Sequence, residues 1–567
     1  KSGRSIITYN GETYNTEELV NLAGLDRASF IGHSDTEVIV ECAEKMGLPW
    51  LLEHADGIFA IAYFDIEKQE LQLARDYLGV KPLYFGWSKE FCIWSSEYSS
   101  IVSHPHFRKN SVSKSALQGY FEYGFVQEGE GLLENTLFIP QGEIVIISSD
   151  GSFKTEPYDA GLSRMQDLIK DHSLDSSVQT AVKEQLVGDV PIGTFVSGGV
   201  DSVLVTSYAS KVNKGQLKGY TIAVQDKNLD ESESAVKLVG LMEGSVEHNI
   251  TSVQDKAILD SLQMYKRSMG EPLADFSSLL MLQVCKEASK DLVVVLSGDG
   301  GDELFYGYPR FRNAQELTAF FSRSYPWKIY RLIKSRFVGR KLPFELLKFT
   351  SFEHYYLKKQ GITGNERSVP RILSGWDPTY RPYNFKKLTF STRRQDPMVF
   401  AKDLEMKIHL QRVLLKVDRA SMFNSVEVRV PFLSKRLVAA SNNYAFSDCV
   451  SDTDLKLPLK SLISLKLGKA GHDIVTGVKK GFEPPLDAWL RNELKDEVEG
   501  VITKIPMKLR NFMDDKGIMD LWKEHLDGVK NNADAIWAIY SLFIWVNENI
   551  DRKSTRLNSS HLRVSRM

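Results

Sequence analysis

The alternation of apolar and polar residues changes character partway along the chain. Up to residue 158, short apolar runs separated by turn residues predict strands, at Ser5–Tyr9, Gly57–Phe64, Leu71–Leu73, Leu83–Trp87, Phe91–Ser95 and Gly142–Ser148. Two stretches with helical periodicity interrupt them, Thr16–Ala23 and Thr36–Met46, and Ser34-Asp35 is typical of a helix N-cap. The pattern predicts a layered α+β domain over residues 1–158.

From Val190 onwards, apolar strands alternate with helices. Strands are predicted at Pro191–Val196, Gly219–Val224, Val246–Ile250 and Leu292–Leu296, and helices at 159–185, Val203–Ser210 and Glu231–Met242. This order predicts an α/β, doubly wound parallel sheet whose ligands gather at the carboxyl ends of the strands. After Phe305 the pattern is mostly helical as far as Asn549, so we predict a second domain over 159–550 with a helical C-terminal part.

Composition narrows the class of protein. Hydrophobic residues make up 43% of the chain, charged residues 25%, and the net charge is −2, so no nucleic acid or anionic membrane is expected as a partner. No apolar run approaches the roughly 20 residues that span a bilayer. The four cysteines lack the spacing of zinc ligands, and a reducing cytoplasm is therefore expected.

The first candidate site follows the strand that ends at Val196, and its sequence is Ser197-Gly198-Gly199-Val200-Asp201-Ser202. Glycines here let the backbone approach a phosphate, which the serine hydroxyls and the next helix's N-terminus can bind. The Lys of a P-loop is missing. Asp201 would repel a phosphate unless a cation lies between them, so the loop predicts a Mg²⁺–pyrophosphate site.

A second glycine-rich turn follows the strand at Leu292–Leu296, with the sequence Ser297-Gly298-Asp299-Gly300-Gly301-Asp302-Glu303. Three glycines and three acids in the six residues Gly298–Glu303 suit neither a core nor a helix, but they suit a turn that binds a cation. We expect Asp302 to share Mg²⁺ with Asp201. Asp299 is expected to meet the carboxylate substrate or the attacking nitrogen.

A third set of charged residues lies in the helical part, Lys416-Val417-Asp418-Arg419-Ala420-Ser421-Met422 followed by Glu427-Val428-Arg429-Val430-Pro431-Phe432. Farther on, Lys456-Leu-Pro-Leu-Lys460 and Lys479-Lys480-Gly481-Phe482 add cations that could neutralise a departing pyrophosphate. Without further context, charged residues of this kind usually form ion pairs on the protein surface.

Together, these motifs resemble the class II glutamine-dependent asparagine synthetases. The resemblance rests on the ordered set SGGVDS, SGDGGDELFYGY, KVDRASM, EVRVPFL and KKGFEPPLDAWL. The first part of the chain agrees, because it resembles the family's Ntn-type glutaminase domain. The resemblance lies in Asn10-Gly11-Glu12-Thr13-Tyr14-Asn15, Gly32-His33-Ser34-Asp35-Thr36-Glu37 and Ala74-Arg75-Asp76 with Gly79-Val80-Lys81-Pro82. The match covers about residues 5–545.

The resemblance implies a role for each matching residue. Asn10 and the Gly11 N–H would form the glutaminase oxyanion hole, and Glu12 and Asp35 would hold the amino end of glutamine. Asp201 and Asp302 would bind magnesium, Asp299 and Asp418 would serve the acyl substrate, and Lys456 would be the catalytic lysine. ATP and pyrophosphate would bind Val196, Ser197, Gly198, Gly199, Asp201, Ser202, Val224, Ser297 and Gly298.

The sequence departs from the family pattern in several places. No Cys precedes Asn10 to act as the N-terminal nucleophile, and the Arg-Gly-Pro-Asp that grips the glutamine carboxylate is absent, so we expect the N-terminus to be truncated. After the second strand of the predicted parallel sheet, the family usually has Gly-Phe, whereas this chain has Val224-Gln225. After Pro-Phe-Leu the family usually has Asp, whereas this chain has Ser434. Residues 551–567 resemble a translated sequencing adapter and are expected to lie outside the fold.

These features lead to one hypothesis and two alternatives. The hypothesis is a ligase that forms a C–N bond: it adenylates a carboxylate with Mg-ATP, usually aspartate in the family, and amidates it with ammonia from glutamine. The present chain is expected to depend on free ammonia, and a homodimer is left open. The first alternative is a related enzyme that amidates a sugar carboxylate of surface polysaccharides or closes a β-lactam ring. The second is a non-catalytic binding protein of the same fold.

Overall fold

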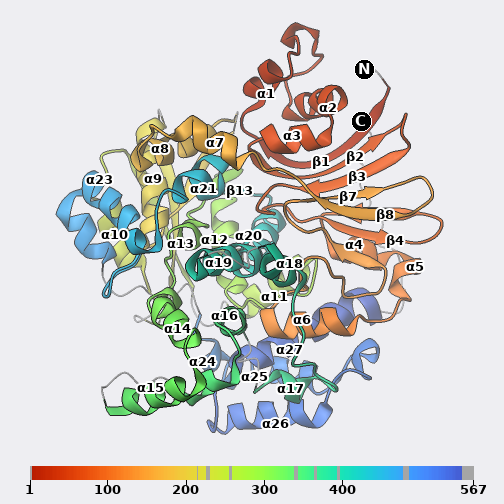
Figure 1. Ribbon diagram of the computed structural model, residues 1–567, viewed down its shortest axis with the longest axis vertical. Helices are drawn as coiled ribbons and strands as arrows, with labels where there is room; N and C mark the ends of the chain where they lie inside the picture. Colours follow the sequence, from red (N-terminus) through yellow and green to blue (C-terminus); the bar gives the residue numbers. More distant parts are fainter. Residues whose placement is uncertain are drawn as a thin grey trace.

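The computed structural model describes residues 3–188, 190–213, 215–224, 226, 230–253, 258–337, 343–362, 367–391, 396–476 and 484–551 (Figure 1). The predicted cationic segment Lys479-Lys480-Gly481-Phe482 and the residues 552–567 of the predicted tail lie outside these ranges.

The N-terminal part contains an antiparallel sheet in the order β1-β2-β3-β7-β8. Its strands are β1 (Ser5–Thr13), β2 (Gly57–Asp65), β3 (Glu70–Arg75), β7 (Glu143–Ile147) and β8 (Phe153–Pro157). Successive residues of β2 face opposite sides of this sheet. Phe59 and Ile61 belong to one hydrophobic cluster, and Ala60 and Ala62 belong to another.

Each face of the antiparallel sheet is covered by a second layer. The face of Phe59 packs against α1 (Thr16–Leu22), α2 (Asp35–Met46) and α3 (Leu48–His54), which lie beside β1 in Figure 1. The opposite face packs against a smaller antiparallel sheet in the order β5-β4-β6, formed by β4 (Tyr84–Trp87), β5 (Cys92–Ser95) and β6 (Thr136–Phe138). The predicted layered α+β fold is confirmed. The pattern missed β6, which is three residues long, and β8, whose residues are mostly polar and exposed.

The second part contains a five-stranded parallel sheet in the order β11-β10-β9-β12-β13. Its strands are β9 (Ile192–Phe195), β10 (Leu217–Val224), β11 (Val246–Val253), β12 (Val294–Leu296) and β13 (Glu427–Arg429). The crossover helices are α9 (Val200–Val212), α10 (Ser232–Val239), α11 (Ile258–Ser268) and α12 (Ser278–Ala288). The predicted parallel α/β sheet is confirmed, with one strand more than the pattern indicated.

Two local differences from the prediction matter for the site. The helix α9 begins at Val200, so Asp201 and Ser202 lie in its first turn instead of in a loop. The fifth strand, β13, was hidden within the charged third motif, where three residues are too few for a visible alternation.

The rest of the chain is mostly helical, as predicted. Its buried side chains belong to the same hydrophobic core as those of the parallel sheet. The elements that concern the site are α8 (Leu174–Gln185), α13 (Gly301–Leu304), α20 (Leu410–Phe423) and α23 (Leu457–Val475). Every residue of α27 (Ala533–Val546) except Asp534 is buried. Within the described ranges, no helix combines the length and apolarity needed to cross a membrane.

Candidate functional site

The first glycine loop connects β9 to α9 and is held by its own serines. The Ser197 N–H donates to Ser202 Oγ over 3.0 Å, and the two hydroxyl oxygens lie 2.8 Å apart. The Gly199 N–H donates to Ser197 Oγ over 3.1 Å. The hydroxyls therefore lie at the N-terminus of a 13-residue helix, where oriented N–H groups favour an anion.

The second glycine loop lies directly against the first. A Cβ on Gly298 would lie 2.5 Å from the Ser202 nitrogen, and one on Gly301 would lie 2.3 Å from Asp201 Oδ1. Gly300 has φ +96° and starts α13. The two loops can touch only because these positions carry no side chain.

A buried lysine lies between the two loops. Lys456, which precedes α23 and has φ 56°, brings its ammonium to 2.6 Å from Asp302 Oδ1 and also into contact with Asp201 Oδ2. Burial by itself lowers the pKa of Lys456, but the charges of Asp201 and Asp302 outweigh it and raise this pKa above its ordinary value. The site is tightly packed, since a Cβ on Gly307 would lie 2.0 Å from both Lys456 Cε and Asp302 Oδ1.

The carboxylates of Asp201 and Asp302 fit the requirements of Mg²⁺. They converge on one cationic position, and Mg²⁺ typically takes one or two protein carboxylates together with phosphate oxygens and water. No group of three or more His, Cys, Asp and Glu side chains suited to a metal occurs among the described residues. These two carboxylates would therefore be its protein ligands, and the phosphates of a nucleotide would complete the set.

Two further acids lie close to this cluster. Asp299 lies partly buried beside Ser297, whose hydroxyl donates to its carboxylate over 2.6 Å, and the loss of solvation raises the pKa of Asp299. Burial also raises the pKa of Glu303, to about 8, and the neighbouring charge of Asp302 adds to the effect. Raised carboxyl pKa values beside a candidate ATP site are typical of groups that handle protons. Glu303 was not among the predicted site residues.

Val224, a predicted ATP-binding residue, ends β10, and its backbone N–H lies 3.4 Å from Asp230 Oδ1.

The predicted glutamine site lies at the end of β1. Gly11 has φ +147°, and a Cβ there would lie 1.9 Å from the Ile58 carbonyl oxygen, so only glycine fits. Asp35 begins α2 and accepts the Thr13 N–H over 3.2 Å, which brings it to the end of the same strand. Burial raises the pKa of Glu12 to about 7, although the charge of Arg429 opposes this shift.

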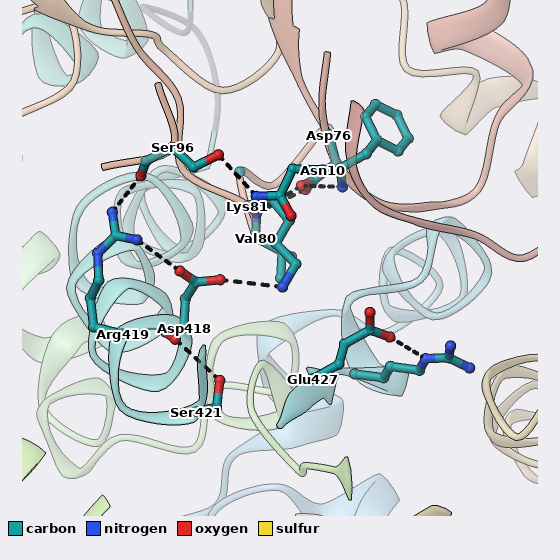
Figure 2. Close-up of polar contacts among 12 residues, drawn as sticks. Asn10, Asp76, Val80, Lys81, Ser96, Asp418, Arg419, Ser421 and Glu427 are labelled. Atoms are coloured by element: carbon teal, nitrogen blue, oxygen red, sulfur yellow. Dashed lines mark hydrogen bonds and ion pairs between the residues drawn. The ribbon is translucent and has the colours of Figure 1, made fainter. Parts of the chain in front are cut away.

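Asp418 lies on α20, at the contact between the two parts of the chain. One of its oxygens is 3.3 Å from the Lys81 ammonium and the other is 3.1 Å from the Arg419 guanidinium, as Figure 2 shows. Arg419 also makes a two-pronged pair with Glu271, with distances of 2.7 and 2.6 Å. The structure thus brings Asp201, Asp302 and Lys456 together and places Asp418 in a separate buried ion network.

Sequence reasoning missed the residues that join the two parts. They include Lys81, Ser96, Arg419 and Arg429, and Glu271 holds the Arg419 guanidinium in place. Lys81, Arg419 and Arg429 do lie within recognisable motifs, and that was the available signal. Ser96 and Glu271 carry no local signal, because their partners are far away in the sequence.

Comparisons with known proteins indicate the family of the chain. A family model described as "Asparagine synthase" matches residues 173–547, and one described as "Glutamine amidotransferase domain" matches residues 1–159. The chain is 26% identical to glutamine-hydrolysing asparagine synthetase 1 of Bacillus subtilis, and the alignment covers 98% of this chain and 87% of that protein. It is 30% identical to synthetase 3 of the same organism, over 76% and 68% of the two chains.

A putative asparagine synthetase 2 of Methanocaldococcus jannaschii is 29% identical over 75% of this chain and 83% of that protein. Among solved structures, a glutamine phosphoribosylpyrophosphate amidotransferase from B. subtilis with ADP and GMP is 13% identical. It covers 44% of this chain and 62% of that chain, and its TM-score of 0.20 is too low to support an argument. The two family models and the extended sequence matches agree with each other, and the chain belongs to the glutamine-hydrolysing asparagine synthetase family.

Proposed function

We propose that this chain activates the side-chain carboxylate of aspartate with ATP and converts it to an amide, with release of AMP and pyrophosphate. The observation that carries the proposal is the convergence of Asp201, Asp302 and Lys456 where the two glycine loops meet. This places opposite charges and oriented N–H groups at the carboxyl ends of β9 and β12, where ligands of such sheets bind.

In the first step a carboxylate oxygen attacks the α-phosphorus of ATP. A P–O bond forms, the bond from the α-phosphorus to the bridging oxygen breaks, and pyrophosphate leaves with the bond electrons. The Ser197 and Ser202 hydroxyls and the N-terminus of α9 bind the departing charge, and Lys456 stabilises it. Asp201 and Asp302 would hold Mg²⁺, which would supply further neutralisation of the phosphate charge.

In the second step ammonia attacks the acyl carbon of the adenylate. A C–N bond forms, the C–O bond to AMP breaks, and the nitrogen loses a proton. We assign the acceptance of this proton to the partly buried Asp299, whose raised pKa makes its carboxylate a better base than an ordinary aspartate.

We propose that Asn10, Gly11, Glu12 and Asp35 bind glutamine, and that the chain as given uses free ammonia. All four cysteines fall within the described ranges, and burial raises the pKa of each, to about 11 for Cys42 and about 12 for Cys449. A thiolate nucleophile requires a lowered pKa. The four thiols are free, which supports our proposal of a reducing cytoplasm.

Product analysis tests the proposal. The chain is incubated with Mg-ATP, ammonium and either L-aspartate or a sugar carboxylate, and AMP with pyrophosphate should form with L-aspartate. Formation of ADP and phosphate would contradict adenylation, and turnover only with the sugar acid would shift the proposal to that alternative. Absence of ATP binding in calorimetry would instead support a non-catalytic protein.

Asp201→Asn tests the proposed magnesium ligand. Removing this charge should lower pyrophosphate release by about a hundredfold or more, the size of effect expected when one preorganised charge-stabilising group is lost. Asp171→Asn, at an exposed position before α8, is the control and should retain full activity. Full activity of Asp201→Asn would remove Asp201 from its proposed role.

A further inference from the structure

Two carboxylates to which the family resemblance gives a ligand, Asp418 and Glu12, each lie near a cation from the opposite part of the chain. Asp418, on α20 in the C-terminal part, contacts Lys81 from the N-terminal part over 3.3 Å. Glu12, on β1 in the N-terminal part, lies 3.6 Å from Arg429, on β13 in the C-terminal part. The two ion pairs therefore cross the same interface in opposite directions.

The Lys81–Asp418 pair is completely enclosed. The two side chains are 4% and 7% exposed, and breaking one buried pair without a replacement charge is costly. Arg419 remains on the second oxygen of Asp418. A positively charged group that binds Asp418 can thus replace Lys81 without leaving the carboxylate unpaired.

Hydrogen bonds lead from this pair to the predicted oxyanion residues along two routes (Figure 2). The Lys81 N–H and the Phe59 N–H both donate to Asp76 Oδ2, each over 3.1 Å, and Phe59 is the strand partner of Gly11.

On the other route, Arg419 donates to the Ser96 carbonyl over 2.6 Å, and the Ser96 hydroxyl accepts a hydrogen bond from Asn10 Nδ2 over 2.9 Å. Both routes therefore start at Asp418 and end at the predicted glutamine site.

Arg429 makes the corresponding connection from Glu12 to the ATP loops. Its carbonyl oxygen accepts the Ser297 N–H over 2.9 Å, at the start of the second glycine loop. Its guanidinium donates to the carbonyls of Gln185 and Val187, on the segment that leads into β9. The Arg429 backbone thus contacts the second glycine loop, and its guanidinium contacts the segment before β9, the strand whose other end leads into the first loop.

We propose that Lys81 and Arg429 are interdomain latches, and that the ammonium groups of the two amino-acid ligands compete with them for Asp418 and Glu12. The proposal rests on the function proposed above. It also defines the acyl substrate as an α-amino acid, because a sugar acid has no ammonium group with which to displace Lys81. Since both latches cross one interface, release of the first lowers the cost of releasing the second. Glutamine and aspartate should therefore strengthen each other's binding.

Steady-state kinetics with ammonium as nitrogen source test the latches. In the unmodified chain, saturating L-glutamine should lower the KM for L-aspartate by about fivefold or more, the lower end of typical coupling between sites. Lys81→Met, which keeps the length of the side chain but removes its charge, should lower this KM without glutamine and reduce the glutamine effect to less than about twofold. Lys154→Met, in which an exposed lysine is replaced, is the matched control and should behave as the unmodified chain.

The outcomes separate the latch from the enzyme activity. A chain that forms no AMP and pyrophosphate contradicts the proposed function. A chain that forms both, but whose KM for aspartate is unaffected by glutamine or by Lys81→Met, contradicts the latch alone.

If Lys81→Met does not fold, hydrogen–deuterium exchange of the unmodified chain decides. The Val80 and Lys81 amides, both bonded to Asp76, should exchange faster when L-aspartate and Mg-ATP are added. Unchanged exchange at both amides would overturn the proposal.

Discussion

Four of the carboxylates proposed to bind ligands share one property, which is that each lies close to a basic side chain. Asp201 and Asp302 contact Lys456, Asp418 contacts Lys81, and Glu12 lies near Arg429. A buried charge without a partner is strongly unfavourable, so the fold requires these pairs. Because of this pairing, a cationic group of a ligand must compete with a lysine or an arginine for the carboxylate. The affinity of the ligand then depends on how much more strongly the carboxylate binds the ligand than the side chain.

Glu12 makes glutamine binding dependent on pH. Its pKa of about 7 means that it becomes protonated, and loses its attraction for an ammonium group, as the pH falls below 7. The Kd for L-glutamine, measured by calorimetry between pH 5.5 and 8, should rise towards acid by up to about tenfold per pH unit. Glu12→Gln should bind weakly at every pH and lose most of this dependence. A flat profile in the unmodified chain would contradict the assigned role of Glu12.

At the scale of elements, helix starts and strand ends position the site. The Ser34 hydroxyl caps α2 by accepting the Glu37 N–H, and Asp35 is the first residue of this helix. At the start of α9, Ser202 accepts the Ser197 N–H and Ser197 accepts the Gly199 N–H, so the two hydroxyls hold the loop that leads into this helix. Parallel pairing of β12 with β9 and β13 then brings the second glycine loop next to the first. These local structures place polar side chains at strand ends, where ligands of such sheets bind.

Removal of the α2 cap should affect both stability and glutamine binding. Ser34→Ala should lower the free energy of unfolding by about 1 kcal/mol and should also weaken glutamine binding, because Asp35 follows the cap directly. Ser173→Ala removes the equivalent cap of α8, where Ser173 accepts the Ser176 N–H, and serves as the control. Urea unfolding should show similar losses in the two variants, but calorimetry should show a weaker glutamine affinity only for Ser34→Ala. Equal affinities would exclude a link between the cap and the site.

At the scale of the whole molecule, buried polar contacts join the two parts of the chain. Lys435 donates to the carbonyls of Leu52 and Glu53 over 2.8 and 2.9 Å, and its backbone N–H lies 3.3 Å from Asp56 Oδ1. Burial lowers the pKa of Lys435 to about 8 and raises that of Asp56. Such contacts fix the orientation of the glutamine site relative to the ATP loops.

Lys435→Met should therefore destabilise the interface. The substitution leaves the Leu52 and Glu53 carbonyls without this donor. Each unsatisfied carbonyl lowers the free energy of unfolding by about 1–3 kcal/mol when no water takes the place of the lysine ammonium. The thermal midpoint should fall, and differential scanning calorimetry should show the two parts unfolding less cooperatively. Lys469→Met, at a lysine side chain that is 87% exposed, is the control and should leave the unfolding profile unchanged. An unchanged profile for Lys435→Met would show that the interface does not depend on this lysine.

Much of the fold and of the ATP loops could be predicted from the sequence, because these features depend on local patterns. A short apolar run marked β2, and glycines directly after apolar runs marked both loops. Other features depend on packing between distant segments. The three-residue strands β6 and β13 are too short for a pattern, and the first turn of α9 takes up residues that the sequence assigned to a loop.

The sequence by itself thus determined the family, the class of fold and the position of the glycine loops at strand ends. Only the tertiary structure decided which charges meet. Lys81 and Asp418 are 337 positions apart, and no local periodicity connects them. The cost of burying an unpaired charge makes such pairs necessary, but the packing of α20 and β13 against the N-terminal sheet determines their partners.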